Sequence, residues 1–386
     1  MAETTLTLLY ELGLIIIIAS LASELFKKIK LPGLIGAILV GLFLGGPGGI
    51  GLVTDLNLVN MLALIGSILI LFTTGLEFDV DSFWRTGKVA FLLTTGGVIM
   101  SIILGFILGE CLGFNPTASL LLGIVIAPSG TSVIAHILTV NDKVSTKTGS
   151  TLLTACIVDD VEGVLLLTVA LGIAASGTAN YFEITRVILI STFFVLASIY
   201  VGGKILPKII YQASRIFSDE IFFAILFGFG LILAFIASNF GLAAITGAFI
   251  MGAIIPYKKI GEKIGYRLFM MKELFSTIFF ASIGLSVNPY TVAEESFRIM
   301  LILFLAIMFR FAGGIVGGGV AGLRGKNLAT SALGLSIRAE MSLIIAREAF
   351  IAGFVDNVFL SITTAVVVAT IFIIIPIFTI MCKGID

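Results

Sequence analysis

Residues 156–163 read Cys-Ile-Val-Asp-Asp-Val-Glu-Gly and lie about midway along an otherwise apolar span, 147–174. An aspartate at the centre of a membrane helix costs roughly 2.5–3.5 kcal/mol, and this stretch holds three acidic residues. A membrane helix forms without acidic residues at this depth. We therefore interpret Asp159, Asp160 and Glu162 as functional. Adjacent helical residues point about 100° apart, and the two aspartates are therefore expected to make different contacts.

The composition around this stretch is that of a membrane protein, whose solvent is lipid. The 386 residues are 59% hydrophobic and 12% charged, with a mean hydropathy of +1.19. The formal net charge is zero and no basic tract is present, so nucleic acid is not an expected partner. The three cysteines lack metal-ligand spacing and indicate neither a disulfide framework nor a zinc site. We expect no cofactor.

Apolar stretches of the length that a bilayer requires, about 20 residues, predict an all-α polytopic protein with about 13 transmembrane helices. Most of the 23 lysines and arginines then fall in loops on one side, which favours an outside N-terminus and an inside C-terminus in the cell (inner) membrane. The predicted spans are 6–26, 33–51, 58–77, 88–113, 118–139, 147–174, 185–205, 220–239, 241–256, 267–286, 297–322, 328–351 and 357–381.

Two short motifs recur in the second half of the chain. Segments 35–41 and 246–252 share a Gly-Ala pair and a later glycine, while Phe-Thr-Thr-Gly-Leu at 72–76 matches Ala-Ser-Ile-Gly-Leu at 281–285. Glycine packing motifs also recur by chance in membrane helices. If the repeat is real, two inverted six-helix repeats are joined by a linker helix, an architecture that places a substrate site near the middle of the membrane.

Two of the predicted spans contain signals that interrupt a helix. The span 118–139 holds Ala-Pro-Ser-Gly-Thr-Ser at 127–132, and its counterpart 328–351 holds Gly-Leu-Ser-Ile-Arg-Ala-Glu-Met-Ser at 334–342. An ordinary proline kink would explain the first alone. The second irregularity favours a pair of crossed broken helices, because non-helical backbone at this depth must line a protected cavity.

Carboxylates beside such a break suit the binding of a small cation. Their hard oxygens bind a monovalent cation or a proton, and burial opposes ionisation, so the two compete. We therefore predict that Asp160 and Asp159 bind Na⁺ and H⁺. The hydroxyl groups of Ser129, Thr131 and Ser132 are predicted to complete the oxygen shell.

Basic residues inside the predicted helices need partners of their own. Arg310 lies well within 297–322, and a buried arginine requires a carboxylate, for which we predict Asp159; snorkelling to an interface is the alternative. Arg338 and Glu340 are predicted to neutralise half-helix ends and to pair with each other or with Glu162, although a purely structural role stays open. The single histidine, His136, is expected to pack just beyond the first break, outside the site.

The chain resembles the monovalent cation:proton antiporter superfamily, and within it the NapA and Kef-type clade. Leu-Pro-Gly-Leu-Ile-Gly at 31–36, leading to Gly46-Pro47, is similar to the second-helix motif of the family. Leu-Phe-Thr-Thr-Gly-Leu-Glu-Phe-Asp at 71–79 is similar to the ending of its third helix. Together with Asp159-Asp160, these motifs make a specific match, and the resemblance covers nearly the whole chain.

This resemblance implies a homodimer built from one transmembrane transporter domain, 1–386. Its scaffold and dimer part would be 1–87 and 216–296, its linker helix 175–215, and its core ion-transport part 88–174 and 297–386, which moves as an elevator. Asp160 matches the ion-binding aspartate, and Asp159 the preceding position, which is aspartate in electrogenic members. Arg310 stands where NapA-like proteins have a lysine.

The resemblance implies a secondary active antiporter that exchanges Na⁺, and also Li⁺, for H⁺. Alternatives are a K⁺/H⁺ antiporter or a Kef-like potassium efflux system, and a sodium-coupled organic anion symporter. Kef-type relatives carry a soluble regulatory domain after the membrane part; the chain ends at Asp386 without one, and we expect a plain antiporter. An enzyme is not expected, because an intramembrane aspartyl protease needs its two aspartates on separate helices.

Overall fold

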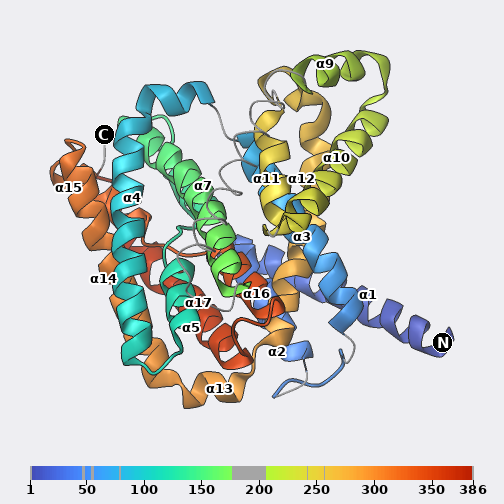
Figure 1. Cartoon of the computed structure of the whole chain (residues 1–386), viewed down its shortest axis with the longest axis horizontal. Coiled ribbons are helices and arrows are strands. Elements are labelled where there is room, and N and C mark those ends of the chain that lie inside the picture. Colours follow the sequence, from blue (N-terminus) through green and yellow to red (C-terminus); the bar gives the residue numbers. More distant parts are fainter. Residues whose placement is uncertain are drawn as a thin grey trace. The chain divides into compact units, whose positions relative to one another are not determined.

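The computed structural model describes residues 2–45, 48–53, 56–77, 80–175, 206–240, 242–255 and 257–384. Within them the chain forms sixteen helices and no strand, which confirms the all-α prediction (Figure 1). The predicted span 185–205 and most of the predicted linker 175–215 lie outside the described residues, as do Gly46-Pro47 and residues 78–79. The count of thirteen spans therefore stays a prediction. Seven described segments are long and apolar enough to cross a bilayer: Thr7–Lys28, Leu56–Glu77, Gly87–Cys111, Asp219–Asn239, Ile264–Ser286, Ser296–Val320 and Asn357–Cys382.

The contacts within the chain divide it into two compact units. Unit 1 comprises Met1–Asp79 and Leu171–Ser286. Its helices are α1 (Ala2–Lys28), α2 (Gly33–Leu44), α3 (Leu56–Glu77), α9 (Leu206–Ile216), α10 (Asp219–Asn239), α11 (Ala244–Ile254) and α12 (Tyr257–Ser286).

Glycines bring the unit 1 helices into close contact. A Cβ atom on Gly41 of α2 would lie 2.0 Å from the carbonyl oxygen of Ala281 on α12, and one on Gly252 of α11 would lie 2.1 Å from that of Phe72 on α3. Backbones can approach this closely only where no side chain intervenes. These glycines belong to the recurring motifs, so both copies of the motif serve the same packing role. The inverted repeat itself stays a prediction.

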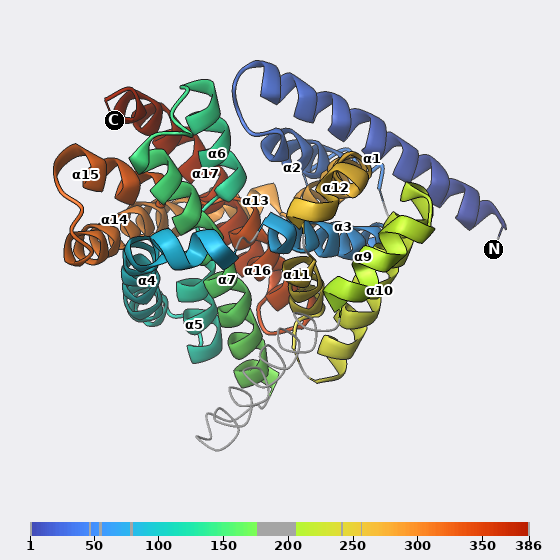
Figure 2. The same ribbon diagram turned by 90° about the horizontal axis from the view of Figure 1, so that it is seen from above.

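Unit 2 comprises Val80–Ala170 and Val287–Asp386. Figure 1 shows α4 and α14 of this unit side by side and α5, α16 and α17 close together, and Figure 2 shows α5 beside α4 and α15 beside α14, in agreement with their packing contacts. Its helices are α4 (Val80–Cys111), α5 (Pro116–Val125), α6 (Thr131–Val140), α7 (Lys147–Ala175, the last five residues of which belong to unit 1), α13 (Pro289–Glu294), α14 (Ser296–Val320), α15 (Gly325–Gly334), α16 (Glu340–Ile351) and α17 (Asn357–Cys382).

Both predicted breaks are present in unit 2. The span predicted at 118–139 is divided into α5 and α6 by residues 126–130, and the span predicted at 328–351 into α15 and α16 by residues 335–339. Pro128 lacks the N–H group that would continue α5. The interruptions leave carbonyl and N–H groups without helical partners in the middle of each span.

Several predicted ends are wrong. α2 stops at Leu44 rather than at residue 51, because the glycines that follow do not sustain a helix. α4 begins at Val80 and α12 at Tyr257, eight and ten residues before the predicted spans. The apolar criterion misses these extensions because charged residues remain helical outside the bilayer. It also misses the short helices α9 and α13.

Candidate ion-binding site

The two breaks of unit 2 lie against each other. The N–H of Gly130, in the first break, donates to the carbonyl of Ile337 in the second at 2.8 Å. A Cβ atom on Gly130 would lie only 2.6 Å from that of Ala339, so this position requires a glycine. Backbone groups of the two breaks thus satisfy one another where the segments cross.

The guanidinium group of Arg338 lies between the ends of two half-helices. Its Nε donates to the carbonyl of Ile126 at 2.9 Å and its Nη1 to that of Ser336 at 2.8 Å, just beyond the C-terminal ends of α5 and α15. Nη2 donates to the carbonyl of Ala306 at 2.7 Å. A positive charge is favourable at helix C-termini, and this part of the prediction agrees with the contacts. The predicted pairing of Arg338 with Glu340 or Glu162 is wrong, because its donors bind carbonyl oxygens instead.

Glu340 lies at the N-terminal end of a half-helix, whereas Arg338 lies at C-terminal ends. It is the first residue of α16, and its Oε1 accepts a hydrogen bond at 2.9 Å from the backbone N–H of Ser132 in the first turn of α6. A carboxylate is favourable at helix N-termini. Ser132 is therefore tied to Glu340 through its backbone, and its side chain is exposed and bonded to neither aspartate.

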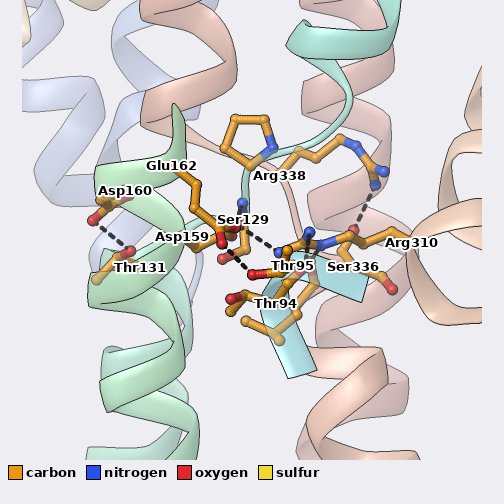
Figure 3. A network of polar contacts seen from close by, with 12 residues as sticks. Thr94, Thr95, Ser129, Thr131, Asp159, Asp160, Glu162, Arg310, Ser336 and Arg338 are labelled. Carbon is orange, nitrogen blue, oxygen red and sulfur yellow. Dashed lines mark hydrogen bonds and ion pairs between the residues drawn. The ribbon is translucent and has the colours of Figure 1, made fainter. Parts of the chain in front are cut away.

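The ion pair predicted between Arg310 and Asp159 is present. Nη2 of Arg310 on α14 lies 2.6 Å from Oδ1 of Asp159 on α7, and the two side chains are 1% and 0% exposed (Figure 3). The other oxygen of Asp159 accepts the backbone N–H of Ser129 at 2.6 Å. Both carboxylate oxygens are thus held by donors fixed in the fold, which compensates the cost of burying the charge.

Arg310 is itself held by backbone carbonyls. Its Nε donates to the carbonyl of Leu335 in the second break at 3.2 Å, and its Nη1 to that of Thr94 on α4 at 3.1 Å. Gly97 of α4 leaves the room that this side chain occupies, because a Cβ atom there would lie 2.9 Å from both Cδ and Nη1 of Arg310.

Asp160 has a different environment from its neighbour. It is buried, and its Oδ2 accepts the hydroxyl of Thr131, the first residue of α6, at 2.9 Å. A hydroxyl group can rotate and present a lone pair to a cation, whereas a backbone N–H or a guanidinium cannot. The oxygens of Asp160 and Thr131 therefore lie side by side, and the hydroxyl oxygen of Thr131 can turn towards a ligand.

Two further predicted residues lie beside the aspartates. The hydroxyl of Ser129 is buried beside the thiol of Cys156, and its role as a cation ligand stays a prediction. Oε1 of Glu162, one turn beyond Asp159, accepts the hydroxyl of Thr95 on α4, and Oε2 has no hydrogen-bond partner. Sequence reasoning missed Thr95 and Gly97, because nothing local marks a threonine or a glycine of α4 as the neighbour of α7 or α14.

The expectation for His136 is wrong, since this side chain is exposed on α6 rather than packed beyond the break. Among the described residues no group of three or more histidine, cysteine, aspartate or glutamate side chains is arranged to hold a metal ion. The candidate site combines carboxylates with the neutral hydroxyl oxygens of threonine side chains.

Interrupted helices that meet beside buried carboxylates in an all-helical membrane protein define an ion-coupled transporter. The sodium/hydrogen exchanger, transmembrane, family matches residues 13–383, and the chain belongs to this family. The resemblance that the motifs indicated is thereby confirmed, and the family is one of membrane transporters rather than enzymes.

Similar proteins agree with this assignment over almost the full chain. The Na(+)/H(+) antiporter of Enterococcus hirae is 26% identical over 353 residues, 90% of each chain. The Na(+)/H(+)-K(+) antiporter GerN of Bacillus cereus is 26% identical over 370 residues, 94% of this chain and 92% of GerN. The solved structure of the sodium proton antiporter MjNhaP1 from Methanocaldococcus jannaschii has a TM-score of 0.77 at 18% identity, covering 99% of this chain and 97% of that one. This last likeness shows the fold.

Proposed function

We propose that the protein is a secondary antiporter of the cell membrane that exchanges Na⁺ or Li⁺ for H⁺, with cation and proton competing at Asp160. The observation that carries this proposal is the difference between the two aspartates. Asp159 is held on both oxygens by Arg310 and by a backbone N–H, whereas Asp160 meets the rotatable hydroxyl of Thr131. A carboxylate that accepts from a hydroxyl can exchange that donor for a cation, because the hydroxyl can rotate and present a lone pair.

The surroundings of Asp160 favour a cation. The carboxylates of Asp159, Asp160, Glu162 and Glu340 outnumber the guanidinium groups of Arg310 and Arg338 in this part of unit 2. Arg310 forms an ion pair with Asp159, and Arg338 donates hydrogen bonds to carbonyls of the breaks. A local excess of negative charge attracts a positively charged ligand.

The division of the chain supports an elevator mechanism. Every residue of the candidate site lies within unit 2, on α4, α6, α7, α14, α16 and the two breaks. A unit that contains the whole site can carry the ion as a body, without taking the site apart. We propose that unit 2 moves in this way and that unit 1 is the scaffold through which two copies form a homodimer.

The test is exchange in proteoliposomes that contain the purified protein. A pulse of Na⁺, Li⁺ or K⁺ is applied to vesicles loaded with a pH-sensitive dye, and Asp160→Asn is the matched variant, because it keeps the size of the side chain and removes the charge. We expect Na⁺ and Li⁺ to drive proton movement in the wild type only. Retained sodium-driven proton movement in well-folded Asp160→Asn would show that cation and proton do not compete at Asp160.

Potassium is a second candidate for the transported cation, on the basis of one observation. The printed name of GerN includes both sodium and potassium, and the oxygens around Asp160 are compatible with either ion. Proton movement driven by K⁺ but not by Na⁺ in the same assay would replace sodium with potassium in the proposal and leave the exchange site unchanged.

A further inference from the structure

Glu162 lies one turn beyond Asp159 on α7 and faces the same side of the helix. Residues three apart are neighbours on a helix surface, and Figure 3 shows both side chains reaching from α7 toward Arg310 of α14 and Thr95 of α4. Asp160, two residues before Glu162, points about 200° away from it around the helix. Glu162 therefore belongs to the Arg310 side of α7 and not to the side of Asp160.

The contacts of Glu162 hold its carboxylate beside Arg310. Oε1 of Glu162 accepts the hydroxyl of Thr95, and the adjacent residue, Thr94, accepts Nη1 of Arg310 on its carbonyl at 3.1 Å. The carboxylate of Glu162 interacts electrostatically with both Asp159 and Arg310. Its other oxygen, Oε2, is buried and has no hydrogen-bond partner. One guanidinium group thus lies beside two carboxylates, of which Asp159 binds it directly.

Two carboxylates beside one guanidinium leave a surplus of negative charge. Asp159 alone balances Arg310, and a further buried carboxylate is unfavourable unless it is paired. The hydrogen bond from Thr95 does not require that charge, because a neutral oxygen accepts a hydroxyl equally well. The surplus therefore suits a state in which Asp159 no longer balances Arg310 in full. A cation beside Asp160 creates such a state, since it also attracts the charge of the adjacent Asp159.

We propose that Glu162 is a second counter-ion of Arg310, which compensates the guanidinium when a monovalent cation bound at Asp160 draws on the charge of Asp159. This rests on the proposed exchange function. An arginine does not reduce its own charge by releasing a proton, so Arg310 needs a carboxylate in every state of the cycle. Thr95 is a positioning residue that keeps Glu162 within reach of Arg310.

The test is a double-mutant cycle on thermal stability in detergent and sodium-free buffer. Glu162→Gln keeps an oxygen that accepts the hydroxyl of Thr95 and removes only the charge. We expect little change in the melting temperature from this substitution alone, because Asp159 still balances Arg310. In the Asp159→Asn protein the same substitution leaves Arg310 with neither carboxylate. The melting temperature of the double variant should therefore fall by more than the sum of the two single shifts.

Glu340→Gln is the matched control for this cycle. Glu340 also has a buried oxygen without a hydrogen-bond partner, but its other oxygen binds the backbone N–H of Ser132. Its combination with Asp159→Asn should be additive. A purely structural role of Glu162 would give the same effect of Glu162→Gln in both backgrounds, and that additive result would overturn the proposal.

Removal of Arg310 should reverse the sign of the effect. In the Arg310→Ala protein, Glu162→Gln removes one of two carboxylates that then face each other without a positive charge, so we expect it to raise the melting temperature. A fall in the melting temperature there would contradict the counter-ion role. If Arg310→Ala does not fold, the cycle with Asp159→Asn decides alone.

Sodium provides the second readout. A ligand that binds the folded protein raises its melting temperature, and we expect Glu162→Gln to lose most of the shift that sodium causes in the wild type. Glu162→Asp keeps the charge and should restore part of it. A full sodium shift in Glu162→Gln would overturn the proposal. A wild type that shows neither a sodium shift nor exchange would count against the proposed function, whereas the cycle without sodium tests the pairing of Glu162 with Arg310 independently.

Discussion

Arg310 on α14 and Asp159 on α7 form a buried ion pair with 2.6 Å between Nη2 and Oδ1. The pair joins residues that are 151 positions apart in the chain. Since the same guanidinium also binds carbonyls of Thr94 and Leu335, Arg310 links α4, α7, α14 and the second break. It is therefore both the counter-ion of Asp159 and a connection between the helices that surround the site.

Replacement of Arg310 tests that structural role. Arg310→Ala leaves Asp159 buried without its counter-ion, and breaking such a pair typically costs about 3–5 kcal/mol. We expect a marked fall in thermal stability in detergent, measured by fluorescence-detected size-exclusion chromatography. Arg310→Lys keeps the charge but cannot reach all three acceptors, and it should recover part of the loss. Equal stability of Arg310→Ala and the wild type would show that the pair contributes little.

Substitution of Gly97 should impair stability and exchange, as substitution of a charged residue of the site would. The methyl group of Gly97→Ala would lie 2.9 Å from Cδ and Nη1 of Arg310 and would push the guanidinium from its acceptors, at a cost of about 1–3 kcal/mol. Gly319→Ala on α14 is the matched control, since nothing lies within 4 Å of a Cβ atom there. We expect slower exchange and a lower melting temperature for Gly97→Ala alone. Indistinguishable variants would contradict this account of the Arg310 position.

The features that sequence could predict are those in which a residue conflicts with its expected surroundings. Pro128 in the middle of an apolar span predicted the first break, and Arg310 far from either end of its span predicted a buried carboxylate partner. Both conflicts concern residue types that a membrane helix tolerates only with compensation. Asp159 was the partner predicted for that arginine, and the ion pair is present.

The remaining contacts depend on backbone geometry that residue types do not reveal. Arg338 was expected to meet a carboxylate, yet it binds three carbonyl oxygens, which every residue possesses and which only the path of the two breaks brings together. The contact between Gly97 and Arg310 arises likewise from the packing of α4 on α14. Charge alone therefore located the site but did not determine how each charge is satisfied.

Thr131 should contribute to cation affinity. Its hydroxyl binds Asp160, and Thr131→Val removes the oxygen while keeping the shape of the side chain. We expect the apparent KM for sodium in proteoliposomes to rise by roughly tenfold, as for the loss of a contact with a charged group, and Thr131→Ser to restore it. Thr168→Val, a buried substitution farther along α7, serves as the control for helix effects. An unchanged KM in well-folded Thr131→Val would remove this residue from the site.

The charge moved in each cycle depends on whether Asp159 takes up a proton. The resemblance to electrogenic double-aspartate relatives predicts two protons per sodium, one on each aspartate. The contacts favour the opposite outcome. Arg310 does not release a proton under physiological conditions, and protonating Asp159 would place an added hydrogen among donors that already occupy both of its oxygens. Asp159 then stays ionised while Asp160 alone exchanges its ligand, so we expect one-for-one, electroneutral transport.

Capacitive current on a solid-supported membrane decides between these stoichiometries. A sodium jump on wild-type proteoliposomes should give exchange that a pH dye detects, with no net charge displacement beyond that of protein-free membranes. The exchange rate should not respond to a potassium-diffusion potential imposed with valinomycin. Asp159→Asn removes the anion that Arg310 neutralises, so its purified form should be less thermostable than the wild type by the margin expected for a broken buried pair. A robust sodium-dependent current in the wild type would instead mean that Asp159 is protonated during the cycle and that its ion pair with Arg310 opens at each turnover.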